Sequence, residues 1–171
     1  MRTAIVDHIE KVAGHWKGEC YAWDVVNEAI EEDGSFRRSI FYEVLGSEYI
    51  DLAFKTAARV DPNAKLYYND YNLEWPSKKT EATQMLVKDL RRKGIKIDGV
   101  GLQAHLTAEG HPTLDQHIAA IQGFADLDVD VALTELDVRL RLPATATNLA
   151  QQKEAYANVS KYITLPNWTK R

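Results

Sequence analysis

The stretch "YAWDVVNEAI", residues 21–30, joins an apolar run to two polar side chains, Asn27 and Glu28. A short run rich in aromatic and β-branched residues is typical of a buried strand. A carboxylate is costly to bury unless it is paired or used. The position of Glu28 at the end of this strand therefore points to a site, and the neighbouring elements decide what fold would hold it.

Three further runs of the same kind follow along the chain, and each carries polar side chains directly after apolar ones near its C-terminal end. They are AKLYYND (64–70), DGVGLQAHL (98–106) and VDVALTELDV (129–138). Apolar residues at helical spacing flank these runs over residues 2–16, around 41–45, from 47 to 60, over 78–93, from 113 onward and over 147–162. This regular alternation predicts an α/β fold in which four parallel strands are covered by outer helices.

Local signals indicate where two of these helices begin and how a third packs. Ser47 is expected to cap the helix that follows it. Thr113 and Gln116 have the spacing of a capping box. In the helix over 78–93, Met85, Leu86 and Leu90 are expected to face inward.

The composition is that of a globular domain: 171 residues, 45% hydrophobic and 27% charged, with a net charge of −4. The basic run KDLRRKGIK (88–96) has no interleaved aromatic residues and is typical of a solvated helix end, so no nucleic-acid partner is expected. Cys20 is the only cysteine, which excludes an internal disulfide. Residues 2–14 are charged and helix-periodic, so neither a signal peptide nor a membrane partner is expected for this chain.

The four strand ends supply the candidate site residues. Parallel strands of an α/β fold end at one rim, so side chains far apart in the sequence are expected to converge there. Taken singly, a glutamate at a strand end is usually a solvated loop residue, but two glutamates across one rim suit glycoside hydrolysis, with an acid/base and a nucleophile. The residues are Asn27 and Glu28, Asn69 and Tyr71, Gln103 and His105, and Glu135 and Asp137.

Four segments resemble the strand-end motifs of family 10 glycoside hydrolases, the (β/α)8-barrel endo-1,4-β-xylanases: WDVVNEA, YYNDYN, GVGLQAHL and ALTELDVR. The resemblance implies a partial TIM barrel, strands four to seven, with a partial catalytic domain at 1–163 and a divergent tail at 164–171. It also implies an extracellular, secreted protein. The other four strands are expected outside these residues, because such a barrel needs about 250 residues.

The resemblance further implies a role for each strand-end residue. Glu28 would be the general acid/base and Glu135 the nucleophile of a double displacement with retention. Asn27 would hydrogen-bond the 2-hydroxyl of the sugar at the cleaved bond. The remaining roles are contact of His105 with the nucleophile, orientation of His105 by Asp137, and lining of the site by Gln103 and Tyr71. Asn69 would support the site.

This mechanism makes demands on the charges of the two glutamates. Glu135 must be ionised while Glu28 is protonated, so we expect the charge of Glu135 to raise the pKa of Glu28. The two carboxyl groups of a retaining site are expected about 5–5.5 Å apart. No metal or organic cofactor is required.

Three functions stay open at this point. The first is a hydrolase acting on xylan and xylo-oligosaccharides, and the second is a catalytically inactive fragment of such an enzyme. The third is a carbohydrate-binding module that stacks sugars on Tyr67, Tyr68, Tyr71, Trp75 and Trp168. An open half-barrel would also expose strand edges, which favours self-association.

Overall fold

The structure is a computed structural model that describes residues 1–163 of the chain. Its helices are α1 (Arg2–His15), α2 (Ile40–Leu45), α3 (Glu48–Val60), α4 (Lys78–Arg92), α5 (Leu114–Ala125) and α6 (Ala146–Ile163). Its strands are β1 (Ala22–Asn27), β2 (Lys65–Asp70), β3 (Gly99–Leu102), β4 (His105–Thr107), β5 (Asp130–Leu133) and β6 (Asp137–Arg139). The expected alternation of helices and strands is confirmed.

Four of the strands form one parallel sheet in the order β1-β2-β3-β5, and β4 pairs with β6 in a second parallel sheet. Within the larger sheet, each strand therefore lies beside the strand of that sheet that comes next along the chain. Consecutive parallel strands joined by outer helices are the repeating unit of a TIM barrel. The predicted α/β fold with four parallel strands is confirmed, as a partial barrel.

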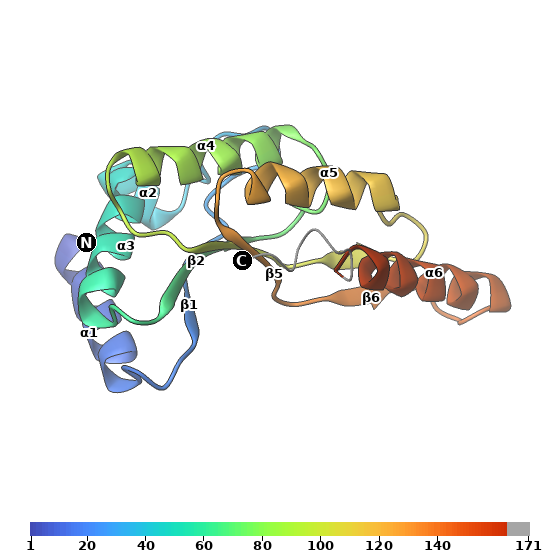
Figure 1. The fold of residues 1–171 in the computed structure, drawn as a ribbon, viewed down its shortest axis with the longest axis horizontal. Helices are drawn as coiled ribbons and strands as arrows, with labels where there is room; N and C mark the ends of the chain where they lie inside the picture. Colours follow the sequence, from blue (N-terminus) through green and yellow to red (C-terminus); the bar gives the residue numbers. More distant parts are fainter. Residues whose placement is uncertain (164–171) are drawn as a thin grey trace.

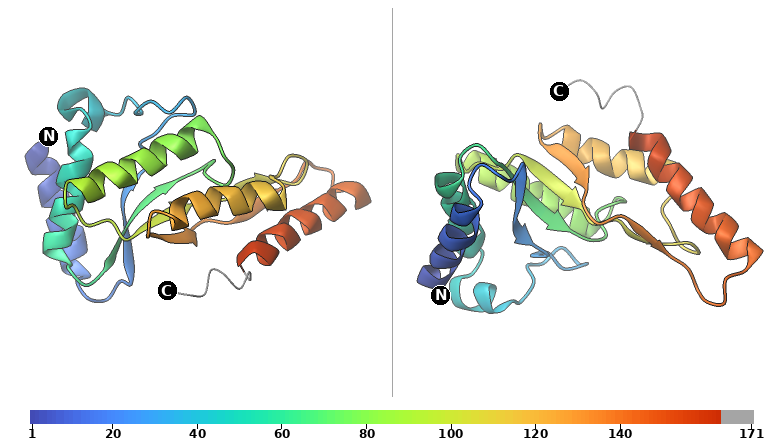
Figure 2. Two further views of the ribbon diagram at one scale, coloured as in Figure 1. Left: turned by 45° about the horizontal axis from the view of Figure 1, so that its top comes forward. Right: turned by 90° about the horizontal axis from the view of Figure 1, so that it is seen from below.

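The helices and the sheet form two layers with the core between them. Figures 1 and 2 show α4 and α5 side by side along one face of the sheet. Fully buried residues from the strands and helices meet there, including Leu66 and Val100 from the sheet and Phe54, Val87 and Phe124 from the helices. Burial of this apolar face stabilises the layered arrangement and leaves the other face of the sheet for polar side chains.

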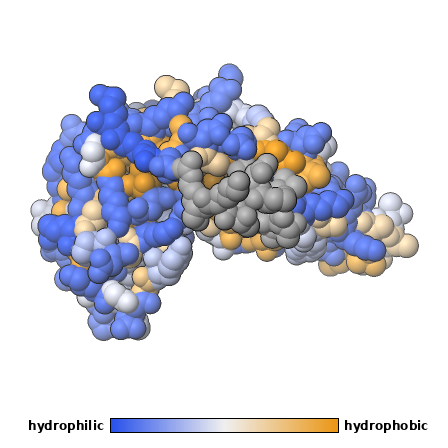
Figure 3. All heavy atoms as spheres, viewed as in Figure 1, coloured by the Kyte–Doolittle hydropathy of each residue, from blue (hydrophilic) through white to orange (hydrophobic). Residues whose placement is uncertain are grey.

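The surface carries both polar and apolar regions. The face seen in Figure 3 is mainly hydrophilic, with hydrophobic residues gathered in smaller areas. A cavity of about 620 Å³ lies between α1, β1 and α2, lined by residues such as Ile9, Val25 and Phe41, and it reaches Glu28. In the sheet formed by residues 1–163, β1 and β5 each have a partner strand on one side only. None of the helices described is long and apolar enough to cross a membrane.

Two of the expected strands are interrupted. The run 98–106 divides into β3 and β4, and the run 129–138 divides into β5 and β6. Between β3 and β4, Ala104 has a φ of 58°, and its N–H donates a hydrogen bond of 2.7 Å to Oε1 of the buried Glu74. The left-handed backbone at Ala104 changes the direction of the chain and ends the strand. Because alanine is apolar, the hydropathy pattern alone does not predict this turn.

The helix signals are partly confirmed. The Thr113 capping box is present, but the expected Ser47 cap is wrong, because Ser47 has helical backbone angles and its side chain makes no cap hydrogen bond. Ser39 caps α2 instead. The inward placement of Met85 is also wrong, since its side chain is 68% exposed, while Leu90 is fully buried. Leu90 is five positions after Met85, so the two side chains lie on different sides of a helix with 3.6 residues per turn.

Candidate active site

A row of aligned residues across the sheet explains how distant strand ends reach one another. Asn27 of β1 is the register partner of Asn69 of β2, which in turn faces Gly101 of β3. A Cβ at Gly101 would overlap Oδ1 of Asn69 and lie 2.8 Å from Cγ2 of Thr134. Because Gly101 has no side chain, Asn69 extends over β3, and Thr134 Oγ1 donates a 2.7 Å hydrogen bond to its Oδ1.

Three amide side chains, those of Gln103, Asn27 and Asn69, link the two glutamates. Asn69 Nδ2 donates to Asn27 Oδ1 at 3.0 Å and to Glu135 Oε1 at 2.8 Å. Gln103 Nε2 donates to Glu28 Oε1 at 3.0 Å and to Asn27 Oδ1 at 3.3 Å. An unbroken chain of hydrogen bonds therefore runs from Glu28 to Glu135, and the structure brings all five side chains to one rim.

Glu28 has an unusual backbone and a paired carboxylate. Its φ is 55°, a left-handed value that is uncommon outside glycine and clusters at functional sites, and its N–H donates to Asn69 O at 2.9 Å. Gln103 and then Arg37, whose Nη1 lies 2.7 Å from Glu28 Oε2, hold the pKa of Glu28 below its usual value, although burial acts in the opposite direction. The expected raised pKa of Glu28 is therefore wrong for this structure, because two N–H donors face the carboxylate.

His105 lies between two carboxylates. Its Nε2 is 3.2 Å from Glu135 Oε2, and its Nδ1 is 3.3 Å from Asp137 Oδ2. The pairing of β4 with β6 places His105 opposite Asp137, which accounts for the second contact. Burial acts to lower the pKa of His105, but Asp137 and Glu135 outweigh it and raise that pKa above its usual value. The imidazole can therefore hold the nucleophile candidate by a charge-assisted hydrogen bond.

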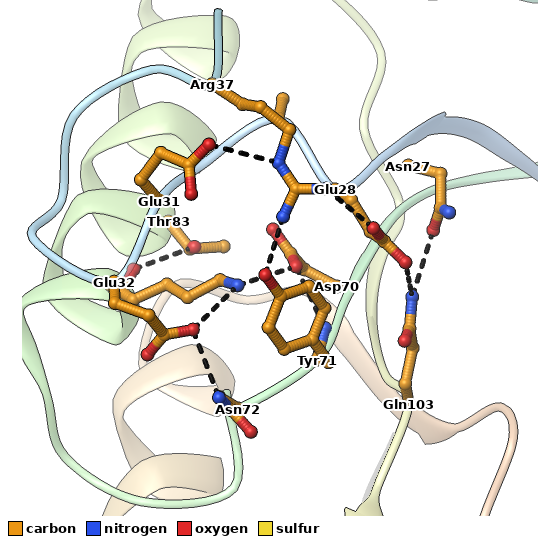
Figure 4. A network of polar contacts seen from close by, with 12 residues as sticks. Asn27, Glu28, Glu31, Glu32, Arg37, Asp70, Tyr71, Asn72, Thr83 and Gln103 are labelled. Carbon is orange, nitrogen blue, oxygen red and sulfur yellow. Dashed lines mark hydrogen bonds and ion pairs between the residues drawn. The ribbon is translucent and has the colours of Figure 1, made fainter.

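Tyr71 contacts two cations: Arg37 through its hydroxyl and Lys79 through its ring. Its hydroxyl accepts a 2.6 Å hydrogen bond from Arg37 Nη2, and Figure 4 shows Arg37 between Tyr71 and Glu28. Lys79 Nζ lies 3.4 Å from the centre of the Tyr71 ring. The same Nζ is 2.9 Å from Asp70 Oδ1, and both side chains of this pair are fully buried. Burial raises the pKa of Asp70, against its contacts with Tyr68 and Lys79.

The sequence pattern of one protein family matches almost the whole chain: glycosyl hydrolase family 10, over residues 1–169. The chain belongs to this family. Endo-1,4-beta-xylanase A of Humicola insolens is 70% identical over 159 residues, which are 93% of this chain and 42% of that protein. Endo-1,4-beta-xylanase A of Fusarium oxysporum f. sp. lycopersici is 46% identical over 166 residues, covering 93% of this chain and 51% of that protein. The family 10 chain thus spans about half the length of these relatives.

Solved structures agree with this family 10 assignment. The GH10 xylanase from Bispora sp. MEY-1 with xylobiose superposes with a TM-score of 0.89 at 43% identity, over 92% of this chain and 49% of the other. Native xylanase 10B from Thermotoga maritima gives a TM-score of 0.89 at 36% identity, over the same shares of the two chains. The resemblance inferred from the strand-end motifs is confirmed, including its partial extent.

Several polar residues of this family 10 site were missed by sequence reasoning. Arg37 lies in a polar loop and Lys79 in the first turn of a helix, where a basic residue is usually solvated. Asp70 directly follows Asn69 in the YYND motif, which could have marked it as a strand-end residue. The alternating glycines of GVG at 99–101 were the available signal for the space that Asn69 fills.

The stacking platforms of a binding module are not available as expected. Tyr67 and Tyr68 are 5% and 0% exposed, so neither ring can receive a sugar, and that expectation is wrong for both. Trp168 and the tail at 164–171 lie outside the described residues, and the division between 1–163 and that tail stays a prediction. Among residues 1–163, no group of three or more His, Cys, Asp or Glu side chains is arranged to hold a metal ion.

Proposed function

We propose that this family 10 chain carries the catalytic carboxylates of a retaining endo-1,4-β-xylanase. The observation that supports the proposal is the hydrogen-bonded chain from Glu28 through Gln103, Asn27 and Asn69 to Glu135. It joins two carboxylates from different strand ends through neutral amides, so the charged groups stay separate and available. That arrangement suits a double displacement on a sugar ring.

In this proposal the two glutamates act in two steps. Glu135 attacks the anomeric carbon while Glu28 transfers a proton to the leaving glycosidic oxygen, and a glycosyl ester forms on Glu135. Glu28, now ionised, removes a proton from water, which attacks the same carbon and releases Glu135. His105 and Asn69 hold Glu135 in place, and Asn27 offers its amide to the 2-hydroxyl of the sugar.

The names of the relatives support a proposal for the substrate. The curated relatives are named endo-1,4-beta-xylanases, and the Bispora structure holds xylobiose. We infer that the substrate is xylan and its xylo-oligosaccharides, and that the protein works outside the cell. The acid step requires a protonated Glu28, so we infer that its lowered pKa belongs to the free site and rises when a sugar excludes water from the cleft.

Hydrolysis of xylan by the purified chain tests this proposal. We expect reducing sugars from the 171-residue chain, and their loss in Glu135→Gln and Glu28→Gln. Glu48→Gln is the control, because within residues 1–163 the one ion pair of Glu48 is with the exposed Arg2. Added azide should restore turnover of an activated aryl xyloside in Glu135→Ala and Glu28→Ala, where the shortened side chain leaves room for the anion, with opposite anomeric configurations of the two products. Undiminished hydrolysis by Glu135→Gln would overturn the assignment.

An inactive but folded chain would favour the second function. Circular dichroism melting and light scattering separate the cases, because cooperative unfolding without turnover indicates an inactive fragment, and an active dimer indicates that self-association completes the cleft. We infer that self-association, where it occurs, uses the edges of β1 and β5.

A further inference from the structure

Arg37 is the one cation that contacts Glu28 directly among the hydrogen bonds and ion pairs of residues 1–163. Its Nη1 donates to Glu28 Oε2 at 2.7 Å, and its Nε lies 3.3 Å from Glu31 Oε1. The guanidinium is therefore shared between a carboxylate of the site and a second carboxylate in the loop after β1, as Figure 4 shows. The exposed fractions of the Arg37 and Glu28 side chains are 28% and 31%, so water screens the pair only in part.

The guanidinium is held in this position by its surroundings. Arg37 N–H donates to Ala29 O at 2.8 Å, which ties the loop back to the end of β1. The Tyr71 hydroxyl accepts from Arg37 Nη2, and the Tyr71 ring rests on Lys79. Lys79 is itself buried against Asp70, so the residues that hold Tyr71 and Arg37 in place lie in the core and not on the surface.

The contacts of Glu28 favour its ionised form. Oε1 accepts from the Gln103 amide and Oε2 accepts from Arg37, so each carboxylate oxygen faces an N–H donor. An amide can rotate and present its oxygen to a protonated carboxyl group, whereas a guanidinium has no acceptor. Protonation of Glu28 therefore weakens its contact with Arg37, and Glu31 is placed to keep the cation when that happens.

We propose that Arg37 is a positioning residue for Glu28, which fixes the direction of its carboxyl group and its charge state, while Glu31 competes for the same guanidinium. This inference rests on the proposed role of Glu28. The lowered pKa of Glu28 agrees with this inference. Gln103 makes the largest contribution to lowering it, and Arg37 lowers it as well. Other charged groups near this cluster are Lys79 from α4, Asp70 from β2 and Glu32 from the loop, with Glu135 across the amide link.

Titration of Glu28 in the whole chain tests the inference without requiring turnover. The readout is the carboxyl 13C shift of Glu28 in isotopically labelled protein, assigned by its loss in Glu28→Gln. We expect the midpoint to move up in Arg37→Met and to move down in Glu31→Gln, because the second change leaves Arg37 to Glu28 alone. Arg37→Lys should give a midpoint between those of wild type and Arg37→Met, because lysine keeps the positive charge but lacks the planar, forked guanidinium.

The neighbouring arginine is the matched control. Arg38 lies in the same loop but pairs with the exposed Glu43, so Arg38→Met should leave the midpoint of Glu28 unchanged. Equal midpoints in wild type and folded Arg37→Met would overturn the inference, and an upward shift in Glu31→Gln would overturn it even where Arg37→Met does not fold. Where the chain hydrolyses xylan, the basic limb of its pH profile should follow the same shifts. Xylan hydrolysis by Glu28→Gln at the wild-type rate would instead remove the proposed function, whatever the titration gives.

Discussion

Replacement of Gly101 by alanine should break the amide link between the two glutamates. The new Cβ would overlap Oδ1 of Asn69, which lies in β2, and lie 2.8 Å from Cγ2 of Thr134, the residue that follows β5. Asn69 is only 2% exposed and is held by hydrogen bonds to Asn27, Thr134 and Glu135, so it cannot move aside without losing some of them. The substitution therefore acts on the site through packing, without removing any polar group.

The size of the effect follows from two contributions. Overpacking of a well-filled region costs about 1–3 kcal/mol. Each lost hydrogen bond of Asn69 adds about 1 kcal/mol. Since the bond to Glu135 is partly exposed, we expect a total loss of roughly 2–4 kcal/mol from the free energy of unfolding. For a domain of this length that lowers Tm by roughly 5–15 °C.

Thermal unfolding followed by circular dichroism measures this loss. Gly14→Ala is the matched control, because the nearest atom to its Cβ is Val60 Cγ1 at an ordinary 3.6 Å and alanine favours a helix. Asn69→Ala should be destabilising alone, but Gly101→Ala should cost much less when it is added to Asn69→Ala, because its main obstacle is gone. Equal Tm values for Gly101→Ala and wild type, or full additivity of the two changes, would refute the crowding argument.

Three other changes test separate parts of the structure. His105 has a raised pKa, so its contribution to stability is complete below about pH 6.5 and is lost as pH rises through the folded pKa; Asp137→Asn should lower the NMR titration midpoint of His105. Lys79→Met leaves Asp70 as a buried charge without its ion-pair partner and should cost about 3–5 kcal/mol in denaturant unfolding, whereas a loss below about 1 kcal/mol would contradict the buried pair. Thr113→Ala removes the capping box of α5 and should cost about 1 kcal/mol, with Thr113→Ser close to wild type by the same measurement.

The order of elements could be predicted because local rules and tertiary packing agree over most of the chain. Thr113 begins a helix by side-chain capping, and the apolar run ending at Asn27 forms a strand, although only Val26 of that strand is buried. The same rules fail where the chain turns inside an apolar run. Ala104 has a left-handed backbone held by a hydrogen bond to Glu74, a residue thirty positions away, and no local pattern contains that information.

The same holds for the candidate site, of which one part could be predicted from the sequence and another could not. Glu28 and Glu135 could be placed at one rim because parallel strands end together. The lowered pKa of Glu28 could not be predicted, because it depends on Gln103 and on Arg37, and Arg37 is in turn held by Tyr71, whose ring lies on the buried Lys79. A basic residue in a polar loop has the same local pattern whether it is solvated or faces a carboxylate.

Covalent trapping bears most directly on the pairing of Glu28 with Glu135. A 2-deoxy-2-fluoro xylobioside with a good leaving group forms a glycosyl ester that hydrolyses slowly, so mass spectrometry of the digested chain can locate it. We predict one adduct, on the peptide that contains Glu135, and none on Glu135→Gln. An adduct on any other residue, or hydrolysis of xylan with inversion at the anomeric carbon, would contradict the account.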